Sequence, residues 1–267
     1  MNIVVCVKQV PDTWSEKKLA ASDSTLDRAA TDPVMNEMDE YAVEEALKLQ
    51  EAHGGEVTIL CMGPDAATET VRKALSMGAD KAIHVLDDGL HGSDALATSL
   101  ALAKAISKAQ EGSPFDLVLL GSESSDARMS VVPAMLAERL GLPQLTFAKE
   151  VTINTGDGAT KISIKRLTDD GYQVVEASTP AVVSVVEKIN EPRYPSFKGI
   201  MAAKKKPVET YGLADLGVDA GEVGSAGAWS KVESFEAAPP RQAGTVVTDD
   251  GEGADKLLEF LASKKFV

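Results

Sequence analysis

The sequence contains few aromatic residues, few cysteines and no long apolar run. Aromatic residues make up 4% of the 267 residues, so a folded core must consist mainly of Val, Leu, Ile and Ala. No apolar stretch approaches the roughly 20 residues that a membrane-spanning helix needs, which argues against membrane insertion. The two cysteines, Cys6 and Cys61, each lie in an apolar run typical of a strand, which predicts buried, reduced thiols. Together these features indicate a cytoplasmic protein.

Positive charge is also scarce. The formal net charge is -14, which argues against nucleic acid as a partner because phosphate backbones attract chains with a basic excess. With 44% hydrophobic and 25% charged residues, the composition is that of an ordinary globular protein. The length suits one large domain or a main domain with extensions. The first ten residues show no basic region before their apolar run and no cleavage site, so we expect no signal peptide.

Short apolar runs alternate with helical patterns through the first ~150 residues, which is typical of βαβ units and a parallel sheet. Glycines 54 and 55 are expected to end the first helix, and Asp65 is expected to cap the second. The pattern predicts an α/β fold with a doubly wound, mainly parallel sheet. The expected strands cover residues 2–7, 56–63, 81–86 and 115–121, and helices are expected near 38–53, 64–79, 93–109 and 130–141.

The pattern changes from Val151 onward. Turn signals at residues 156–158 and 169–171 predict an antiparallel meander, and the apolar run 180–186 is expected to return to the central sheet. After Pro207 the chain is rich in Gly, Ala and Glu and has little core material before a helical pattern at residues 254–266. We therefore expect an α/β domain over residues 1–207 and a C-terminal arm over 208–267 that packs on a partner.

Motifs of self-contained enzymes are missing. His53, His84 and His91 have no second histidine or cysteine at metal-ligand spacing, so they are interpreted as structural. The chain has no G-x-G-x-x-G after a strand, no P-loop and no G-x-S-x-G elbow. A third Asp-Asp-Gly, at residues 249–251, is interpreted as a turn. A hydrolase or dehydrogenase acting alone is therefore not supported.

The segment 121–132 has the residue types of an anion site. A buried strand ends at Gly121, a loop with Ser and Asp follows, and a helix is expected to begin near Ser130. Free amide groups and the helix dipole favour anions at such a place, and Pro133 suits a first helical turn. The alternative is a loop in which Ser130 only caps its helix. Similarly, Asn36 can approach the same crevice or act as a plain N-cap.

Five segments occur together in a fixed order, and the last of them combines exposed-looking aromatics with three lysines. They are CVKQVPD, MNEMDEYAVEEAL, ETVRKALSMGADKAIHV, LVLLG and NEPRYPSFKGIMAAKKK. This set closely resembles the β subunit of electron transfer flavoprotein, and residues 164–185 look like that family's signature region. The resemblance covers residues 2–207 and is looser in the tail.

The resemblance implies an adenine-nucleotide α-hydrolase-like α/β fold and an electron carrier without a catalytic constellation of its own. Such a β subunit forms a heterodimer with an α subunit, which holds most of an FAD. The pair takes electrons from acyl-CoA dehydrogenases of fatty acid β-oxidation and from other dehydrogenases. It passes them to a membrane-bound quinone oxidoreductase of the respiratory chain. The β subunit binds an AMP and contributes to the flavin crevice.

By position, the resemblance assigns the cofactor contacts to the ends of two strands, to one helix start and to one loop. The implied residues are Cys6, Asn36, Glu37, Met38, Asp39, Met62, Gly121, Ser122, Glu123, Ser124, Ser125, Asp126, Ala127, Arg128, Met129, Ser130, Val131 and Val132. The loop departs from the family, which commonly has a run of aspartates and Asn/Gln-Thr-Gly where this chain has SDARMSVVPA. Ser130 is expected to replace a hydroxyl and Arg128 to add a charge. Thr13 and Trp14 are the expected flavin contacts.

Residues 190–206 look like the family's recognition loop for partner dehydrogenases. The implied partner contacts are Tyr194, Pro195, Ser196, Phe197, Lys198, Gly199, Ile200 and Met201. Phe197 stands where the family usually has an anchoring leucine, and one buried aromatic can dominate a small interface. Lysines 204–206 are expected to meet acidic partner surfaces. The alternative is that Phe197 packs internally and the lysines form a solvated face.

Three other functions remain open at this point. Electron-bifurcating relatives hold a second FAD in place of AMP. An ATP-using pyrophosphatase or ligase of the related fold would need a Ser-Gly-Gly-x-Asp-Ser loop after the first strand, and KQVPDTW lacks one. A nucleotide-sensing module of the universal-stress type would leave the segment 190–206 and the tail unexplained.

Overall fold

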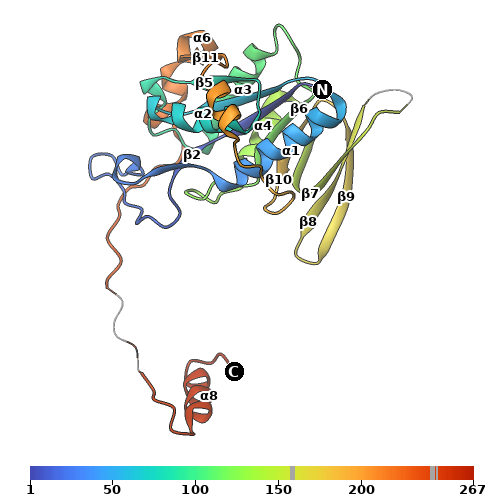
Figure 1. The fold of residues 1–267 in the computed structure, drawn as a ribbon. Coiled ribbons are helices and arrows are strands. Elements are labelled where there is room, and N and C mark those ends of the chain that lie inside the picture. The colour runs from blue at the N-terminus through green and yellow to red at the C-terminus, as the bar shows by residue number, and fades with distance from the viewer. Residues whose placement is uncertain (157–159, 241–243, 245) are drawn as a thin grey trace. The chain divides into compact units, whose positions relative to one another are not determined.

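The computed structural model describes residues 1–156, 160–240, 244 and 246–267. Its main element is a nine-stranded sheet in the order β11-β5-β4-β1-β6-β10-β7-β8-β9 (Figure 1). All neighbouring strands from β11 to β7 are parallel, whereas β8 and β9 continue the sheet in antiparallel fashion. The strands of this sheet are β1 (Ile3–Val7), β4 (Val57–Met62), β5 (Lys81–Val85), β6 (Leu117–Gly121), β7 (Gln144–Asn154), β8 (Lys161–Thr168), β9 (Gly171–Ser178), β10 (Ala181–Val185) and β11 (Val208–Tyr211).

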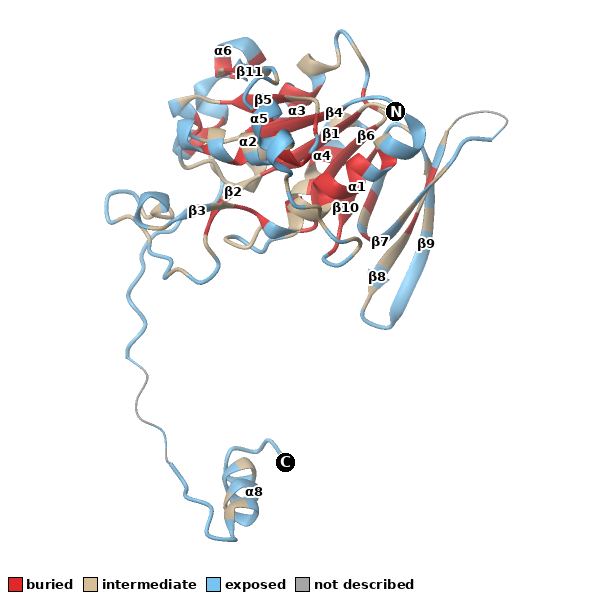
Figure 2. Ribbon diagram, in the orientation of Figure 1, coloured by how far each residue is buried: buried red, intermediate tan, exposed pale blue. Residues whose placement is uncertain are grey.

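Helices cover both faces of the parallel part of the sheet. One buried cluster joins it to α1 (Glu37–His53), α2 (Thr68–Met77) and α5 (Phe197–Ala203). The opposite cluster joins it to α3 (Ala95–Ala109), α4 (Val132–Leu140) and α6 (Leu213–Leu216). Because both faces are covered, β1, β6 and β10 are buried along their whole length (red in Figure 2). The predicted doubly wound α/β fold is confirmed.

Shorter elements complete the chain. The segment between β1 and α1 contains a two-stranded antiparallel ribbon. The remaining elements are β2 (Gln9–Pro11), β3 (Pro33–Met35), α7 (Gly224–Gly227), α8 (Gly253–Ser263) and four 3-10 turns, η1 (Arg28–Ala30), η2 (Asp65–Ala67), η3 (Asp88–Leu90) and η4 (Ala220–Glu222). The predicted N-cap at Asp65 is wrong, since Asp65 lies inside η2 and α2 begins without a side-chain cap.

The sheet reverses its winding direction between β1 and β6. From β1 the chain adds β4 and β5 on one side and then crosses to the other side with β6. In doubly wound folds the crevice outside the carboxyl ends of such a strand pair is where ligands bind. The fold thus creates its main crevice at the ends of β1 and β6.

The antiparallel meander begins earlier than the sequence indicates. β7 starts at Gln144, where its first residues pair with β10, and it bends at an irregularity around Phe147 before pairing with β8. Phe147 has a positive φ of 59°, a backbone conformation that no sequence pattern predicts for an aromatic residue. The β8–β9 turn at Asp169-Asp170-Gly171 is confirmed. In the other expected turn, Asp157 and Gly158 lie outside the described residues.

The chain divides into two compact units, Met1–Glu233 and Ser234–Val267. The sequence predicts the boundary after Pro207, but β11 adds an edge strand to β5 beyond that point. Tyr211, Leu213 and Val223 are buried against the cluster that contains α3. These few apolar side chains are widely spaced among Gly, Ala and acidic residues, so the sequence pattern did not reveal them. In the second unit, α8 has no buried residue.

Candidate functional site

A cleft of about 430 Å³ lies at the carboxyl ends of β1, β4 and β6. The ends of these strands, the start of α1 and the loop before α4 form its walls. Most of the predicted cofactor contacts line this cleft. They are Cys6, Asn36, Asp39, Met62, Gly121, Ser122, Glu123, Ser124, Asp126, Ala127, Met129, Ser130, Val131 and Val132, whereas Glu37, Met38, Ser125 and Arg128 do not line it.

One wall of the cleft is apolar. Cys6, Met62, Leu102 and Leu120 contribute to it from β1, β4, α3 and β6. Burial, and to a lesser extent the charges of Asp39 and Cys61, raise the pKa of the Cys6 thiol above its ordinary value, so the thiol is neutral. Both cysteines are free and buried, as predicted. A neutral, polarisable wall of this kind suits the flat face of an aromatic base.

Asn36 fixes the loop on the opposite wall. It is the N-cap residue of α1, but its side chain makes no cap hydrogen bond. Instead Nδ2 donates to the Glu123 carbonyl at 2.9 Å, and Oδ1 accepts from the Ser125 amide at 3.0 Å. The interpretation of Asn36 as a plain N-cap is therefore wrong. Asn36 ties the start of α1 to the loop after β6.

Asp39, one turn further along α1, joins the ends of β1 and β6. Its carboxylate accepts from the Lys8 amide at 2.8 Å and from the Gly121 amide at 3.2 Å. Gly121 is needed for this approach, because a Cβ there would lie 2.5 Å from the Met38 Cβ and 2.6 Å from the Asp39 carboxylate. Burial raises the pKa of Asp39 to about 7, although the two amide donors and the Lys8 charge act in the opposite direction.

Two cations meet at Asp126. The Lys8 ammonium lies 2.8 Å from Oδ1 and the Arg28 guanidinium 2.9 Å from Oδ2 of a carboxylate that is almost completely buried. These cations hold the pKa of Asp126 at about 2 against the effect of burial. These three side chains together carry one net positive charge, and the cleft lining also includes the carboxylates of Asp39, Asp94 and Glu123.

The loop residues that were expected to compensate for the missing family motif behave differently from each other. Ser130 lines the cleft, and its hydroxyl donates to a Glu123 carboxylate oxygen at 3.3 Å. Ser130 does not cap α4, whose N-cap is Val131 and whose first turn contains Pro133 as predicted. The alternative that Ser130 only caps its helix is therefore wrong. Arg128 is exposed and lies outside the cleft lining, 3.9 Å from Glu123.

Several lining residues were not predicted. Lys8 directly follows β1 and Asp94 caps α3, so the rule that ligands bind beyond strand ends could have found both. Asp94 accepts from the Ala97 amide and also from the amides of Trp229 and Ser230. Arg28 comes from the irregular segment before β3 and had no sequence signal. The missed residues are Val7, Lys8, Leu26, Arg28, Ser93, Asp94, Ala95, Thr98, Leu102, Leu120, Pro133 and Ser230.

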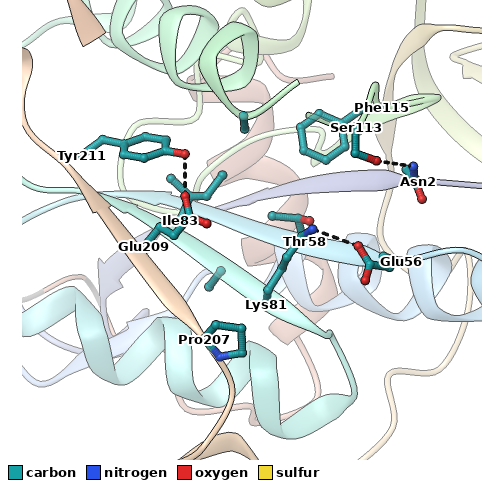
Figure 3. A pocket seen from close by; sticks show the side chains of 12 residues that line it. Asn2, Glu56, Thr58, Lys81, Ile83, Ser113, Phe115, Pro207, Glu209 and Tyr211 are labelled. Carbon is teal, nitrogen blue, oxygen red and sulfur yellow. Dashed lines mark hydrogen bonds and ion pairs between the residues drawn. The ribbon is translucent and has the colours of Figure 1, made fainter. Parts of the chain in front are cut away.

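A smaller cavity of about 80 Å³ lies at the opposite, amino-terminal edge of the strands (Figure 3). Its charged groups are paired with each other: Lys81 contacts Glu56, and the Tyr211 hydroxyl donates to Glu209. The buried Thr58 hydroxyl has no hydrogen-bond partner among the described residues. This cavity is too small for a nucleotide, so the cleft beyond β1 and β6 is the candidate site.

Metal chemistry has no visible basis in the described part of the chain. No group of three or more His, Cys, Asp and Glu side chains there is placed to hold a metal ion. His84 contacts the Gly63 carbonyl at 3.0 Å, and His91 contacts Asp23 at 2.7 Å. The structural interpretation of these two histidines agrees with their contacts.

The predicted partner-binding residues form a separate surface, which we call the docking segment (residues 194–201). Tyr194 is 97% exposed and Phe197 81% exposed, so the alternative that Phe197 packs internally is wrong. The Ser196 hydroxyl caps α5 by accepting from the Gly199 amide at 3.0 Å. α5 approaches α2 so closely that a Cβ on Gly199 would lie 2.5 Å from the Ser76 carbonyl oxygen.

The three lysines after α5 are not equivalent. Lys204 and Lys205 are exposed. The Lys206 ammonium instead donates to the carbonyl of Leu75 in the last turn of α2 and to those of Gly78 and Ala79 just after it. The expectation that all three lysines meet a partner is therefore wrong for Lys206, which satisfies carbonyls that the helix leaves free.

Fold and site together define an α/β protein of the doubly wound class, with a crevice where the winding of the sheet reverses and a separate exposed apolar segment. Residues 23–216 match the family described as electron transfer flavoprotein domain. The chain belongs to this family.

Similarity to individual members extends over the full length. The chain is 53% identical to the electron transfer flavoprotein subunit beta of Mycobacterium tuberculosis (strain ATCC 25618 / H37Rv), over 100% of this chain and 99% of that protein. It is 38% identical to the subunit of the same name from Megasphaera elsdenii, over 100% of both chains. It is also 33% identical, over 100% of both chains, to the caffeyl-CoA reductase-Etf complex subunit CarD of Acetobacterium woodii. Relatives named as flavoprotein β subunits imply that a flavin and a second subunit are involved.

Among the described residues, every helix is too short or too polar to cross a membrane.

Proposed function

We propose that the chain is the β subunit of a heterodimeric electron transfer flavoprotein. It binds AMP in the cleft and, with an α subunit that holds most of the FAD, completes the flavin site. The heterodimer takes electrons from acyl-CoA and other dehydrogenases and delivers them to the respiratory chain through a quinone oxidoreductase. The observation that carries the proposal is a nucleotide-sized cleft with one apolar wall and two cationic side chains, Lys8 and Arg28, on a chain whose full-length relatives are named β subunits.

The cleft residues fit an adenine nucleotide. Cys6 and Met62 would flank the base on the apolar wall. The phosphate would face the Ser130 hydroxyl and the first amides of α4, which have no carbonyl partner within their own helix. Lys8 and Arg28 supply the cationic field, with Asp126 fixing both side chains. The flavin, when bound, supplies the redox chemistry, and the residues of this chain orient it and exclude water. Thr13 and the exposed Trp14 remain its proposed contacts in this chain.

Identification of bound nucleotides tests this function. The native protein, purified together with its α subunit, is denatured and the released nucleotides are identified by mass spectrometry. One FAD and one AMP per heterodimer are expected. A well-folded protein that releases neither nucleotide would contradict the proposal.

A second candidate is the β subunit of an electron-bifurcating flavoprotein. The observation that favours it is full-length similarity to a protein named as a subunit of a reductase-Etf complex. In this case the cleft would hold a second FAD in place of AMP. The same measurement distinguishes the two functions, because two FAD and no AMP would be released.

The docking segment is the proposed contact with partner dehydrogenases, with Phe197 as its anchor. Ile200 and Met201 are 46% and 49% exposed and extend the apolar surface around Phe197. Replacing Phe197 with Ala should slow electron acceptance from an acyl-CoA dehydrogenase about tenfold or more, the cost expected for an aromatic hot spot. Bound nucleotide should be unchanged, and Phe197→Leu should retain most of the rate. Equal rates for Phe197→Ala and the wild type would rule out this role.

We also propose a cytoplasmic location, because both thiols are free and buried in a chain that has no other cysteine.

A further inference from the structure

The docking segment follows directly on an arginine that is bound to α1. The Arg193 guanidinium contacts both carboxylate oxygens of Glu44, with Nε–Oε2 at 2.7 Å and Nη2–Oε1 at 3.0 Å. The Arg193 amide also donates to Glu44 Oε2 at 3.1 Å. Both the backbone and the side chain of Arg193 are therefore held by one carboxylate, in the two-pronged geometry that gives arginine pairs their directionality.

A second carboxylate reinforces this contact from the solvent side. Glu51 lies two turns further along α1 and accepts from Nη1 at 2.6 Å. The Glu44 side chain is 7% exposed and the Glu51 side chain 59% exposed, so the Glu44 contact is the shielded one. The two carboxylates raise the pKa of the guanidinium above its already high ordinary value, so the cluster keeps its charge.

The chain is attached at both ends of the docking segment. On the amino-terminal side, Asn190 Nδ2 donates to the Tyr41 carbonyl and to a Glu45 carboxylate oxygen, both at 3.0 Å. On the other side, Arg72 of α2 donates to the Ala203 carbonyl at 2.6 Å. The segment between these attachments carries the exposed Tyr194 and Phe197.

α1 supports the cleft as well as the docking segment. Its first residues, Asn36 and Asp39, organise the ends of β1 and β6, and its middle holds Arg193 through Glu44. A continuous helix keeps its residues at fixed relative positions. The position of the backbone next to Tyr194 is thus set relative to the cleft by one helix and by the contacts of Arg193 with Glu44 and Glu51.

We propose that Arg193 is a positioning residue that fixes the docking segment in the orientation a partner dehydrogenase recognises. This inference rests on the proposed docking function of Phe197. A preformed binding segment loses less conformational freedom when the complex forms, so Arg193 contributes to affinity without touching the partner. Its effect belongs to complex formation and not to the transfer of electrons within the complex.

The test uses the complete heterodimer with its nucleotides and an acyl-CoA dehydrogenase of the same organism, reduced by its acyl-CoA substrate. For Arg193→Ala we expect the KM for the flavoprotein to rise about tenfold with little change in kcat, as for a loss of preorganisation. Bound nucleotide should be unchanged. The matched control is Glu191→Gln, an exposed carboxylate outside the ion pair, which should behave as the wild type. An unchanged KM for Arg193→Ala would overturn the inference.

A double-mutant cycle with Phe197→Ala separates positioning from general destabilisation. If Arg193 acts through Phe197, adding Arg193→Ala to Phe197→Ala should raise KM by less than about twofold further. If the rise in KM of the double variant equals the product of the two single rises, the inference is overturned while the docking function stands. No effect of Phe197→Ala would instead overturn the docking function.

If Arg193→Ala does not yield folded heterodimer, Arg193→Lys serves in its place. A single ammonium cannot reproduce the two-pronged contact with Glu44, so an intermediate rise in KM is expected. Wild-type KM for Arg193→Lys would contradict the inference.

Discussion

Asp39 shows how a single buried carboxylate can organise a site at an energetic cost. Its two oxygens accept amide hydrogens from the ends of β1 and β6, which fixes the edge of the cleft. Burial nevertheless raises its pKa to about 7 from an ordinary value of 3.8. The ionised form is thus penalised in the folded protein, although it is the form that presents two acceptor oxygens to the two amides.

The raised pKa of Asp39 predicts a specific pH dependence of stability. Between about pH 4 and pH 7 the folded protein binds more protons at this carboxyl than the unfolded chain, so the free energy of unfolding falls as pH rises. At 1.36 kcal/mol per pKa unit, the contribution amounts to about 4 kcal/mol over this window. Asn cannot titrate, so the stability of Asp39→Asn relative to the wild type should improve by about this amount from pH 4 to pH 7. Denaturant unfolding at several pH values measures the difference.

Asp126 supplies the contrasting case. Its pKa is lowered to about 2, so its stabilising contribution is present above about pH 4 and is lost as pH falls towards 2. The difference between Asp126→Asn and the wild type should therefore change only in that lower window. Parallel stability curves for Asp39→Asn and the wild type from pH 4 to pH 7 would contradict the assignment of a raised pKa to Asp39.

At the same scale, the sequence predicted only part of the site. Cys6 and Met62 lie near the ends of strands and Asn36 at the start of a helix, and their positions were predictable from the topology and the resemblance. The orientation of side chains was not predictable. Arg128 has a positive φ of 50° and lies outside the cleft lining, whereas Arg28 reaches Asp126 from 98 positions away.

Among the elements, α2 depends on a lysine that comes from a distant part of the chain. Gly78 ends this helix, and its last carbonyls have no amide partners of their own within it. Lys206 supplies three hydrogen bonds there, and burial lowers the pKa of its ammonium group. The lysine triplet therefore combines one structural residue with two exposed ones.

This difference predicts unequal effects of two neighbouring substitutions. Lys206→Met should lower the free energy of unfolding by about 1–3 kcal/mol, because three carbonyls lose a charged donor in a partly buried place. Lys205→Met removes the same charge at an exposed position and should change stability by less than about 0.5 kcal/mol. Chemical denaturation of both variants provides the comparison. Equal losses would show that net charge, and not the contact with α2, decides the effect.

Elements with regular periodicity were predictable, and irregular ones were not. The buried parallel strands and α1, α2 and α3 lie within a few residues of their predicted bounds. The start of β7 was missed because Phe147 interrupts its alternation with a positive φ. β11 was missed because its burial depends on pairing with β5, and Val208–Tyr211 has too few apolar residues to indicate a strand.

At the scale of the whole molecule, the second unit cannot be stable by burial of its own side chains. In the described part of Ser234–Val267, α8 exposes Leu257, Leu258 and Phe260, each more than half accessible. A single amphipathic helix of 11 residues is marginal in water unless its apolar face packs on another surface. We expect the proposed α subunit to provide this surface, since relatives named as flavoprotein β subunits imply a second chain.

Removal of residues 234–267 should therefore affect assembly and not the fold of the first unit. The truncated chain should unfold with nearly the same midpoint as the isolated full chain, because its core clusters lie entirely within Met1–Glu233. Its affinity for the α subunit should fall at least about tenfold, or 1.4 kcal/mol, as buried apolar contacts are lost. The full-length double variant Leu257→Ser/Phe260→Ser should show the same loss of affinity, which separates the apolar face of α8 from the mere length of the chain. Calorimetric titration with the α subunit measures the affinity of both variants. If both bind as tightly as the wild type, the second unit serves another partner.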